Sequence, residues 1–576
     1  MRMATSQSLC GEFSWRDGSV EQATTQVLHW NGRVDNRDDL WPELLQHCAD
    51  DAAIVLAAYE RWGVKGFHKV MGDWSVIIFD ASLRTIILAS DFAGVRPLYY
   101  QSRPEGVRWS ASLGRLVAAT GASELDTTYI AGFLTFGGYP HRTPYVGIRS
   151  VPAGHAVSVS STSVAVHAFW DLPTTDEIRY RDELRYEEQL RALFRESVAV
   201  RLATAAPVIA ELSGGLDSSS VVCLANRLIR NGVVAARDLS TVSFVHKGSR
   251  DLPFIREVEA FCDVHGVHLD TQRAPLVASS LVGDVTPQPW IPLMLEVARI
   301  AHHRGAKVIL TGQNGDLVTG NWFDDSLQVA GALRHGHIAE ALTQSFAWSR
   351  LLQVPTASIL ARALKATLGY GDSHHNLYSV EGLLAPRRTE TSLVAAFQRA
   401  TGVDDARNVF SSRWAEAPPE RRKHFRALSL LRELRTLQRP DSLEGLDYTH
   451  PFAHRPLVEF LLTIPADVLC RPGRPRMLMR RAFEDLWPPA IRTRRSKSLF
   501  GGPWNDALRP MAIDLLMSPR WLVVERGWVD RTGLTTRLER LICGLECNEP
   551  QLRQIILLEH WLRGRECQQP ALSESA

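Results

Sequence analysis

Cysteine is scarce in this chain, and long apolar runs are absent. Only 8 of the 576 residues are cysteine, and they are scattered rather than grouped at zinc-ligand spacing. The first residues contain no apolar core followed by a small-residue cleavage site, so we expect a reducing, cytoplasmic setting. No stretch approaches about 18 consecutive apolar residues, so the sequence predicts neither a membrane-spanning helix nor a membrane partner.

Net charge is also nearly absent. Lys and Arg number 65 and Asp and Glu 63, which leaves a formal net charge of +2, so no overall field attracts nucleic acid or an anionic membrane. Hydrophobic residues make up 45% and charged residues 22%, which excludes the disordered and low-complexity classes. At roughly 150 residues per domain, the length predicts two to four folding units.

The chain up to about residue 170 has the pattern of short strands separated by turns. Strand-like runs occupy 74–79, 85–89 and 107–110, and a helical stretch occupies 52–62. We therefore expect a layered α+β domain, rich in antiparallel sheet, over residues 1–170. The polar, unpatterned residues that follow predict a linker over 171–182, and the second domain then covers 183–576.

The second domain opens with strands that alternate with helices. Strands are predicted at 207–212, 240–245 and 307–310, and helices at 218–231 and 254–266. This alternation implies an α/β fold with a doubly wound parallel sheet. Beyond Asn321 the pattern is mostly helical, so further helices are added to the sheet, and the poorly patterned stretch 369–388 is interpreted as a loop.

The segment Ser213-Gly-Gly-Leu-Asp-Ser-Ser219 joins the first of these strands to its helix. Its two glycines let a ligand approach the backbone, and the N–H groups at the start of the helix suit a phosphate. Asp217 is acidic where phosphates are expected, which is consistent with a bridging Mg²⁺. A glycine turn that merely caps a helix is the alternative, but ligands bind at the carboxyl ends of strands in such sheets. The Walker pattern GxxxxGK[ST] does not occur in the sequence.

The motif SGGLDSS resembles the signature of the ATP-pyrophosphatase group, whose members cleave ATP between its α and β phosphates and activate a carboxylate as an adenylate. Further segments resemble asparagine synthetases of the glutamine-hydrolysing class, in the same order along the chain. Val308–Asp316 resembles a strand with its SGxGxDE loop, and His450–Phe460 resembles the PFLDxxLVEF segment. The resemblance implies an ATP-pyrophosphatase-like (adenine nucleotide alpha hydrolase-like) domain that adenylates its substrate before an amine attacks, with ATP and Mg²⁺ as cofactors.

The resemblance also assigns roles to individual residues. Asp217 and Asp316 are expected to hold Mg²⁺, and Lys497 to stabilise negative charge on the adenylate and the tetrahedral intermediate. Gln313 is a candidate catalytic residue; it stands where asparagine synthetases usually keep Glu, which argues against ordinary asparagine synthesis. Contacts to ATP or pyrophosphate are expected from Leu212, Ser213, Gly214, Gly215, Ser218, Ser219, Val245, Thr311 and Gly312.

Two regions near these motifs leave alternatives open. Ala453-His454 replace the Leu-Asp of the resembling segment, which predicts a remodelled substrate side, and Asp447 and Glu444 are candidate bases or structural acids. By composition, the arginine-rich stretch 471–497 is either a nucleic-acid face or a solvated surface. The match at its lysine assigns this stretch to phosphate and adenylate instead, so no nucleic-acid partner is expected.

The N-terminal domain resembles the glutaminase half of the same family, an Ntn-hydrolase-like sandwich. The resemblance rests on Leu9–Gly11, Asn31-Gly32, Gly72–Asp80, Ala89–Tyr100, Thr143–Ile148 and Pro152–His155. A working glutaminase needs cysteine as its first residue, because the free α-amine assists the thiol, whereas Cys10 is internal. Processing that exposes Cys10 is the alternative. Arg33 replaces the Glu after Asn-Gly, and the glutamine-binding Arg-Leu-Ser segment is missing. We interpret the domain as a retained scaffold that is catalytically silent, with Cys10 at the former nucleophile position.

Without glutamine hydrolysis, the amine comes from free ammonia or from the substrate itself. Two branches that close an amide within one molecule resemble this chain: β-lactam synthetases and lasso peptide cyclases, which join a peptide's N-terminal amine to an Asp or Glu side chain. The β-lactam branch is expected to have Tyr at position 313, and Gln313 cannot replace it as a base. Segments 72–75, 94–100 and 145–149 are closer to lasso cyclases. The predicted function is macrolactam formation on a linear precursor peptide, with a leader-recognition protein and a leader peptidase as further partners. Asparagine synthesis from ammonia and β-lactam-type ligation are the enzymatic alternatives.

Overall fold

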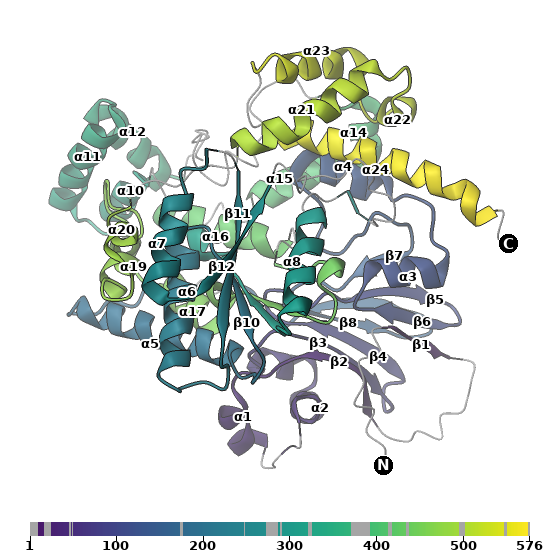
Figure 1. The fold of residues 1–576 in the computed structure, drawn as a ribbon, viewed down its shortest axis with the longest axis horizontal. Helices are drawn as coiled ribbons and strands as arrows, with labels where there is room; N and C mark the ends of the chain where they lie inside the picture. Colours follow the sequence, from purple (N-terminus) through teal and green to yellow (C-terminus); the bar gives the residue numbers. More distant parts are fainter. Residues whose placement is uncertain are drawn as a thin grey trace.

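A computed structural model of the chain describes residues 10–15, 25–44, 48, 50–172, 177–246, 248–271, 286–287, 291–320, 325–369, 392–412, 417–433, 437–494, 501–545 and 550–573. Figure 1 shows the N-terminal strands on one side of the molecule and a second, parallel sheet beside them. Helices α10 to α12 form a lobe at one edge, and α21 to α24 lie together at another. The predicted loop at 369–388 falls almost wholly outside the described residues.

Two antiparallel sheets form the N-terminal domain. Their strands are β1 (Cys10–Ser14), β2 (Gln26–Gly32), β3 (Trp74–Asp80), β4 (Thr85–Ser90), β5 (Tyr99–Arg103), β6 (Gly106–Ser110), β7 (Ile148–Ser150), β8 (His155–Val159) and β9 (Val164–Ala168). One sheet has the order β1-β6-β5-β7 and the other β2-β3-β4-β8-β9. This confirms the antiparallel sandwich expected from the short, turn-bounded runs.

Side-chain alternation explains how these sheets are layered. In β3, Ile77 and Phe79 belong to the core between the sheets, whereas Val76 and Ile78 belong to the core beneath the helices on the other face. Successive residues of a strand point to opposite faces, so a strand that is apolar throughout is covered on both sides. The domain's helical elements are α1 (Arg37–Leu44), α2 (Asp51–Trp62), η1 (Gly63–Lys69), α3 (Leu113–Thr120) and α4 (Thr127–Phe136).

The second domain is built on a five-stranded parallel sheet. Its strands are β10 (Val208–Glu211), β11 (Leu239–Val245), β12 (His265–Asp270), β13 (Val308–Leu310) and β14 (Asp447–Thr449), in the order β12-β11-β10-β13-β14. The doubly wound parallel sheet is therefore confirmed. The helix predicted over 254–266 was too long, because the chain leaves α7 at Asp263 in a left-handed conformation (φ 53°) and then enters β12.

Helices cover both faces of this sheet and extend beyond it. They are α5 (Leu184–Arg201), α6 (Leu216–Arg230), α7 (Leu252–Cys262), α8 (Ile291–His303), α9 (Gly315–Val318), α10 (Gln328–Arg334), α11 (Ile338–Leu352), α12 (Thr356–Thr367), α14 (Ala395–Thr401), α15 (Val403–Ser412), α16 (Pro419–Glu433), η2 (Asp441–Leu443), η3 (Pro451–Ala453), α17 (Arg455–Thr463), α18 (Ala466–Leu469), α19 (Met477–Ala482), α20 (Pro489–Thr493), α21 (Gly501–Met517), α22 (Leu522–Glu525), α23 (Arg531–Ile542) and α24 (Pro550–Ser573). In β10, Val208 and Ala210 pack with α5 and α6, whereas Ile209 belongs to the core with α8. The ligand-binding edge is thus left at the carboxyl ends of the strands.

A buried charge cluster joins the two domains behind β14. Arg201 of α5 donates to Asp73 of the N-terminal domain (3.1 Å) and to the hydroxyl of Thr449 in β14 (2.9 Å). Thr449 in turn donates to Asp73 (2.6 Å), and Arg33 pairs with Asp73 (2.7 Å). The two guanidinium groups hold the pKa of Asp73 far below its usual range. The residue that departs from the glutaminase pattern, Arg33, therefore serves in the contact between domains.

In the part of the chain that the structure describes, no helix is both long and apolar enough to cross a membrane.

Candidate nucleotide site

The loop between β10 and α6 has the geometry of an anion cradle. Gly214 has a left-handed φ of 68°, and a Cβ there would lie 2.9 Å from Phe254 Cβ, so only glycine fits. The Ser218 hydroxyl accepts from the Ser213 N–H (3.1 Å) and lies 3.0 Å from the Ser213 hydroxyl. Gly215 precedes the first residue of α6, and no side chain caps that helix end. The free N–H groups and the helix dipole there favour a bound phosphate.

The loop after β13 packs directly on this helix end. A Cβ on Gly312 would lie 2.6 Å from the Ser218 backbone nitrogen, and a Cβ on Gly315 would lie 2.3 Å from Asp217 Oδ1. Between them, Asn314 adopts a left-handed φ of 72° and donates its side-chain amide to the Phe452 carbonyl (3.0 Å). The two predicted nucleotide segments are therefore brought together, with glycine required at both contact points.

This contact makes Gly315→Ala a test of the site's packing. The added methyl group has to displace the Asp217 carboxylate, so we expect ATP-dependent AMP formation to fall by about 10- to 100-fold, because small misplacements in a site are costly. The matched control is Gly533→Ala in α23, where the nearest atom to the new Cβ is 3.3 Å away. AMP release and thermal unfolding are measured for both variants. Retention of more than half of wild-type activity by Gly315→Ala contradicts the packing argument.

Asp217 and Asp316 converge on one cationic group, the guanidinium of Arg476. Arg476 Nη1 lies 2.5 Å from Asp217 Oδ1, and Nη2 pairs with Asp316 Oδ1. Arg476 is buried, with 4% of its surface exposed. Two carboxylates that share one cation at the strand edge fit the donor set that Mg²⁺ prefers, with further oxygens supplied by nucleotide. No group of three or more His, Cys, Asp or Glu side chains forms a metal centre among the described residues.

A second arginine from the same stretch closes the phosphate loop. Arg494 Nη1 donates to the Gly214 carbonyl (2.7 Å), Nη2 pairs with Asp251, and the guanidinium lies 4.0 Å from the centre of the Phe254 ring. An open depression beside Val245, at the end of β11, is lined by His246, Gly248, Ser249, Leu252, Pro253, Arg256, Glu257 and Ala260. Lys497 lies outside the described residues, and its role stays a prediction.

Gln313 lies at the same edge and contacts a tyrosine from β14. Its side-chain amide donates to the Tyr448 hydroxyl (2.7 Å), and that hydroxyl donates to Glu211 Oε1 (3.3 Å). Thr311, predicted to contact ATP, places its hydroxyl 2.6 Å from His450 Nδ1 and accepts from the Gln313 N–H (3.2 Å). Burial lowers the pKa of His450 to about 4, so this histidine is neutral at pH 7.

The structure corrects one interpretation of the neighbouring segment and favours one of the two alternatives that were open for another. His454 does not lie on a substrate side: it is buried, with Nδ1 3.6 Å from Asp35 of the N-terminal domain. Asp447 pairs with Arg96, and Glu444 pairs with Arg115 at 2.5 Å, so both contact the N-terminal domain, which favours the structural-acid alternative. Local sequence reasoning had no means to detect these partners, because they lie more than 300 positions away.

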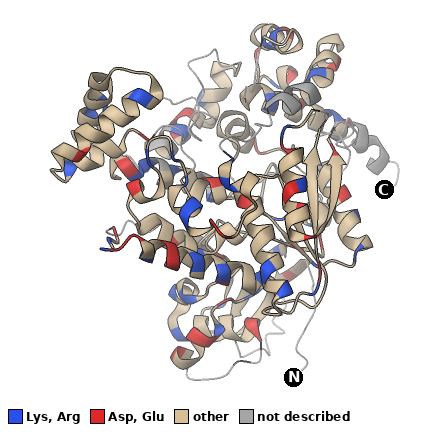
Figure 2. Cartoon of the chain, turned by 60° about the vertical axis from the view of Figure 1, so that its left-hand side comes forward, with Lys and Arg blue, Asp and Glu red and all other residues tan. Residues whose placement is uncertain are grey.

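In the described part of the basic stretch, residues 471–494, several arginines are ion-paired rather than exposed as one face. Arg471 pairs with Glu183 (2.9 Å), Arg481 with Glu187 (2.6 Å) and Arg492 with Glu484 (3.3 Å). Figure 2 shows Lys and Arg interspersed with Asp and Glu on the visible helices. The assignment of this stretch to the nucleotide site is supported for Arg476 and Arg494, which turn inward.

Cys10 begins β1 and is paired within the sheet. It lies opposite Ser110 of β6, and the two side chains are 3.3 Å apart. The thiol thus belongs to the sandwich of the N-terminal domain rather than to the nucleotide site.

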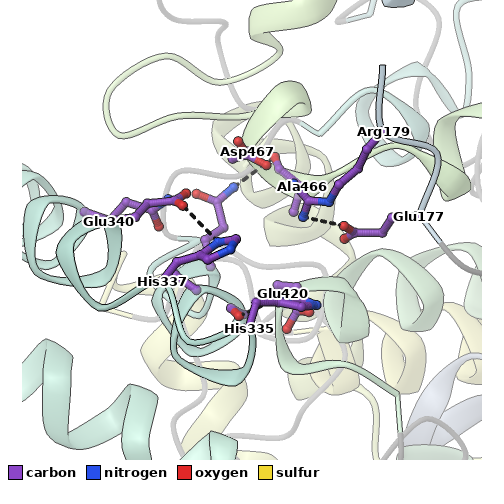
Figure 3. A pocket seen from close by; sticks show the side chains of 12 residues that line it. Glu177, Arg179, His335, His337, Glu340, Glu420, Ala466 and Asp467 are labelled. Carbon is purple, nitrogen blue, oxygen red and sulfur yellow. Dashed lines mark hydrogen bonds and ion pairs between the residues drawn. The ribbon is translucent and has the colours of Figure 1, made fainter. Parts of the chain in front are cut away.

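A polar pocket of a different kind lies between α10, α16 and α18 (Figure 3). Its lining residues are Glu177, Arg179, Gln328, Gly331, Ala332, His335, His337, Glu340, Gln344, Glu420, Ala466 and Asp467. Two pairs of polar side chains lie along it: Arg179 with Glu177 (2.7 Å), and His337 Nδ1 with Glu340 (3.4 Å). None of the residues predicted from the sequence to form the site lines this pocket.

The fold and the site together define a two-domain protein with a glutaminase-like sandwich and an ATP-pyrophosphatase-like sheet. The family model described as asparagine synthase matches residues 189–563, and the one described as a glutamine amidotransferase domain matches residues 19–170. The chain belongs to the asparagine synthase family, which confirms the family predicted from SGGLDSS and the later segments. The lasso cyclase branch stays a prediction.

Three curated relatives indicate the breadth of the similarity. Over 500 residues the chain is 23% identical to asparagine synthetase [glutamine-hydrolyzing] 3 of Bacillus subtilis (strain 168), covering 82% of this chain and 75% of the relative. It is 27% identical to amidase chyE of Penicillium rubens, covering 49% of this chain and 44% of the relative. It is 30% identical to carboxyethyl-arginine beta-lactam-synthase of Streptomyces clavuligerus, covering 43% of this chain and 44% of the relative. The chain thus spans less than half the length of two of these relatives.

Proposed function

We propose that the protein is an ATP-dependent, AMP-forming ligase that closes an amide within one peptide, joining a side-chain carboxylate to the N-terminal amine. The observation that carries the ligase class is the convergence of Asp217 and Asp316 beside the phosphate loop, in a chain of the asparagine synthase family. Gln313, in place of the usual Glu, favours a substrate other than aspartate. The names of the relatives, which include synthetases of asparagine and of a β-lactam, support carbon–nitrogen bond formation.

In this proposal the residues divide the work between two steps. The N–H groups at the start of α6 and the Ser213 and Ser218 hydroxyls hold the β and γ phosphates while the substrate carboxylate attacks the α phosphorus. Bound to Asp217 and Asp316, Mg²⁺ would neutralise charge on the phosphates. Arg476, released from the two carboxylates, is positioned to contact the leaving pyrophosphate.

The second step needs an amine held close to the acyl carbon. The peptide's own N-terminus supplies it, so an intermolecular encounter is replaced by an oriented one, which lowers the barrier substantially. Delivery of the peptide by a leader-recognition protein after a leader peptidase has acted is consistent with this order. Asparagine formation from aspartate and ammonia is the second candidate, favoured by the 82% coverage by the Bacillus relative.

The test incubates the protein with Mg-ATP and a linear core peptide that carries an Asp or Glu. We expect AMP, pyrophosphate and a product lighter by one water. Cys10→Ala serves as a control and is expected to leave the yield unchanged, because the thiol lies in the sandwich. Parallel reactions contain aspartate with ammonia or with glutamine. Formation of asparagine in either reaction, without cyclic peptide, favours the second candidate. If no reaction yields AMP or an amide product, the ligase class is rejected.

A further inference from the structure

Glu211 and Tyr448 meet at the carboxyl edge of the parallel sheet. Neither residue belongs to the two loops that form the nucleotide site. Glu211 is the last residue of β10, and Tyr448 lies on β14, with β13 between the two strands. Ile209, Ile309 and Tyr448 are level in register, and all three belong to the core on the α8 side. Glu211 follows Ile209 by two residues, so its side chain points to the same face.

The Glu211 carboxylate is held by one oxygen only. Oε1 accepts a hydrogen bond from the Tyr448 hydroxyl (3.3 Å), whose oxygen accepts one from the Gln313 amide (2.7 Å). Tyr448 is fixed in turn, because it is 3% exposed and its ring meets the His450 ring edge-on at 4.9 Å. Among the described residues no donor reaches Oε2, and that atom is not sealed from solvent. A proton acceptor therefore lies at the carboxyl end of β10, the edge of the sheet at which the adenylate is expected.

Within the part of the chain that the structure describes, no cationic side chain pairs with this carboxylate. Burial raises the pKa of Glu211 to about 7, and the Tyr448 hydrogen bond opposes this rise to a smaller extent. The described residues of β11 and β13 bring no titratable side chain to it. Asp217 at the start of α6 faces Arg476, and Asp447 on β14 faces Arg96. A carboxyl that titrates near neutral pH suits general base catalysis.

We propose that Glu211 is the general base of amide formation, its Oε2 taking the proton that the attacking amine loses. This inference rests on the proposed function. The amine's lone pair forms the bond to the acyl carbon, the carbon–oxygen bond to AMP breaks, and AMP leaves with that electron pair. The nitrogen's proton passes to the Glu211 carboxylate, and Tyr448 and Gln313 are positioning residues that hold the carboxylate.

The first test separates the two steps in Glu211→Gln, which keeps the shape and an acceptor for Tyr448. Exchange of labelled pyrophosphate into ATP, with the peptide present, is expected within about twofold of wild type, because adenylation needs no base. Cyclic product is expected to fall by about 10²- to 10⁴-fold. Hydroxylamine, a strong nucleophile that captures acyl adenylates, should still yield hydroxamate. Cyclisation by Glu211→Gln at the wild-type rate overturns the proposal, as does equal loss of exchange and cyclisation.

The second test follows the ionisation of the Glu211 carboxyl group through the pH dependence of cyclisation. The peptide amine also titrates, so the ratio of wild-type to Glu211→Gln cyclisation rates is measured at each pH between about 5.5 and 8.5. Below about pH 7 the ratio should fall roughly tenfold per pH unit, as Glu211 takes up a proton. Tyr448→Phe removes a hydrogen bond that lowers the pKa of Glu211, so this acid limb should move to higher pH. Tyr59→Phe, which removes a hydrogen bond to Asp80 in the N-terminal domain, is the matched control and should not move it.

A pH-independent ratio, or an unmoved limb in Tyr448→Phe, overturns the role of Glu211. Failure of the proposed function is visible in the wild-type protein, as absence of both pyrophosphate exchange and cyclic product. Failure of this inference is visible only in the variants, with the wild-type protein active, so the two outcomes are distinguishable.

Discussion

Asp217→Asn is expected to reduce pyrophosphate exchange and AMP formation by about 10³-fold or more. The substitution keeps the size of the side chain but removes one of the two charges that converge on Arg476 and that we propose as the Mg²⁺ ligands. Losing one preorganised charge at a reacting phosphate costs about 4 kcal/mol of transition-state stabilisation, which corresponds to a factor of about 10³. The Mg²⁺ concentration needed for half-maximal exchange should rise in parallel.

The fold of Asp217→Asn should remain intact, because Arg476 keeps its pair with Asp316. Asp514→Asn is the control. The Asp514 side chain is 64% exposed, pairs with Arg563 at 3.2 Å, and is distant in sequence from both nucleotide loops. The activity of this variant should therefore stay within about twofold of wild type. Exchange and thermal unfolding are measured for both variants. An Asp217→Asn protein with more than a tenth of wild-type exchange rate contradicts the metal assignment.

The phosphate loop was predictable because its signal is local. Two glycines, an acid and several hydroxyls lie within seven consecutive residues at the end of a strand. That local pattern is sufficient to predict an anion-binding turn at the start of a helix. The parallel sheet was predictable for a similar reason, since strands that alternate with helices admit few topologies. β14 was missed as a strand because only Asp447–Thr449 are extended, too few residues for a period to be visible.

The rest of the site depends on contacts between distant segments. Composition identified a basic stretch but not which arginines turn inward; Arg476 does so from a left-handed backbone (φ 55°) just before α19. Glu211 appeared in the sequence only as part of a buried strand, and its partner Tyr448 is more than 200 residues away. No local period predicts such a pair, so sequence reasoning considered Asp447 and Glu444 near Pro451 as bases or structural acids and did not consider Glu211.

The boundary between domains links the N-terminal sandwich to the nucleotide site. Thr449 accepts from Arg201, donates to Asp73, and is the neighbour of Tyr448 in β14. The Thr311 N–H, at the start of the second nucleotide loop, donates to the Thr449 carbonyl (3.1 Å). The N-terminal domain thus positions the strand from which Tyr448 reaches Glu211, a structural role that does not require glutamine hydrolysis.

Arg201→Met tests this role and should be strongly destabilising. The Arg201 side chain is fully buried, and it donates to Asp73 (3.1 Å), Thr449 (2.9 Å) and the Ser197 carbonyl (2.9 Å). Breaking a buried ion pair by removing one partner costs about 3–5 kcal/mol, because the remaining charge stays desolvated. For a domain of this size, that loss lowers the unfolding temperature on the order of 10 °C. Arg299→Met, which breaks an exposed pair with Glu296 (2.6 Å), is the control and should cost less than about 1 kcal/mol.

Acidification should reduce the difference in the free energy of unfolding between Arg201→Met and wild type. The pKa of Asp73 is depressed in the folded protein, so its contribution is present above the unfolded pKa of about 3.9 and is lost as pH falls below that value. Without Arg201 the pKa of Asp73 is lowered less. Wild type therefore loses more of its free energy of unfolding than the variant does on acidification below about pH 4. Calorimetric unfolding at pH 7 and near pH 3.5 measures both effects, together with pyrophosphate exchange at a temperature where each variant is folded. If Arg201→Met unfolds at the wild-type temperature and keeps wild-type exchange, the buried cluster does not hold β14 in place, and the N-terminal domain is not what positions the site.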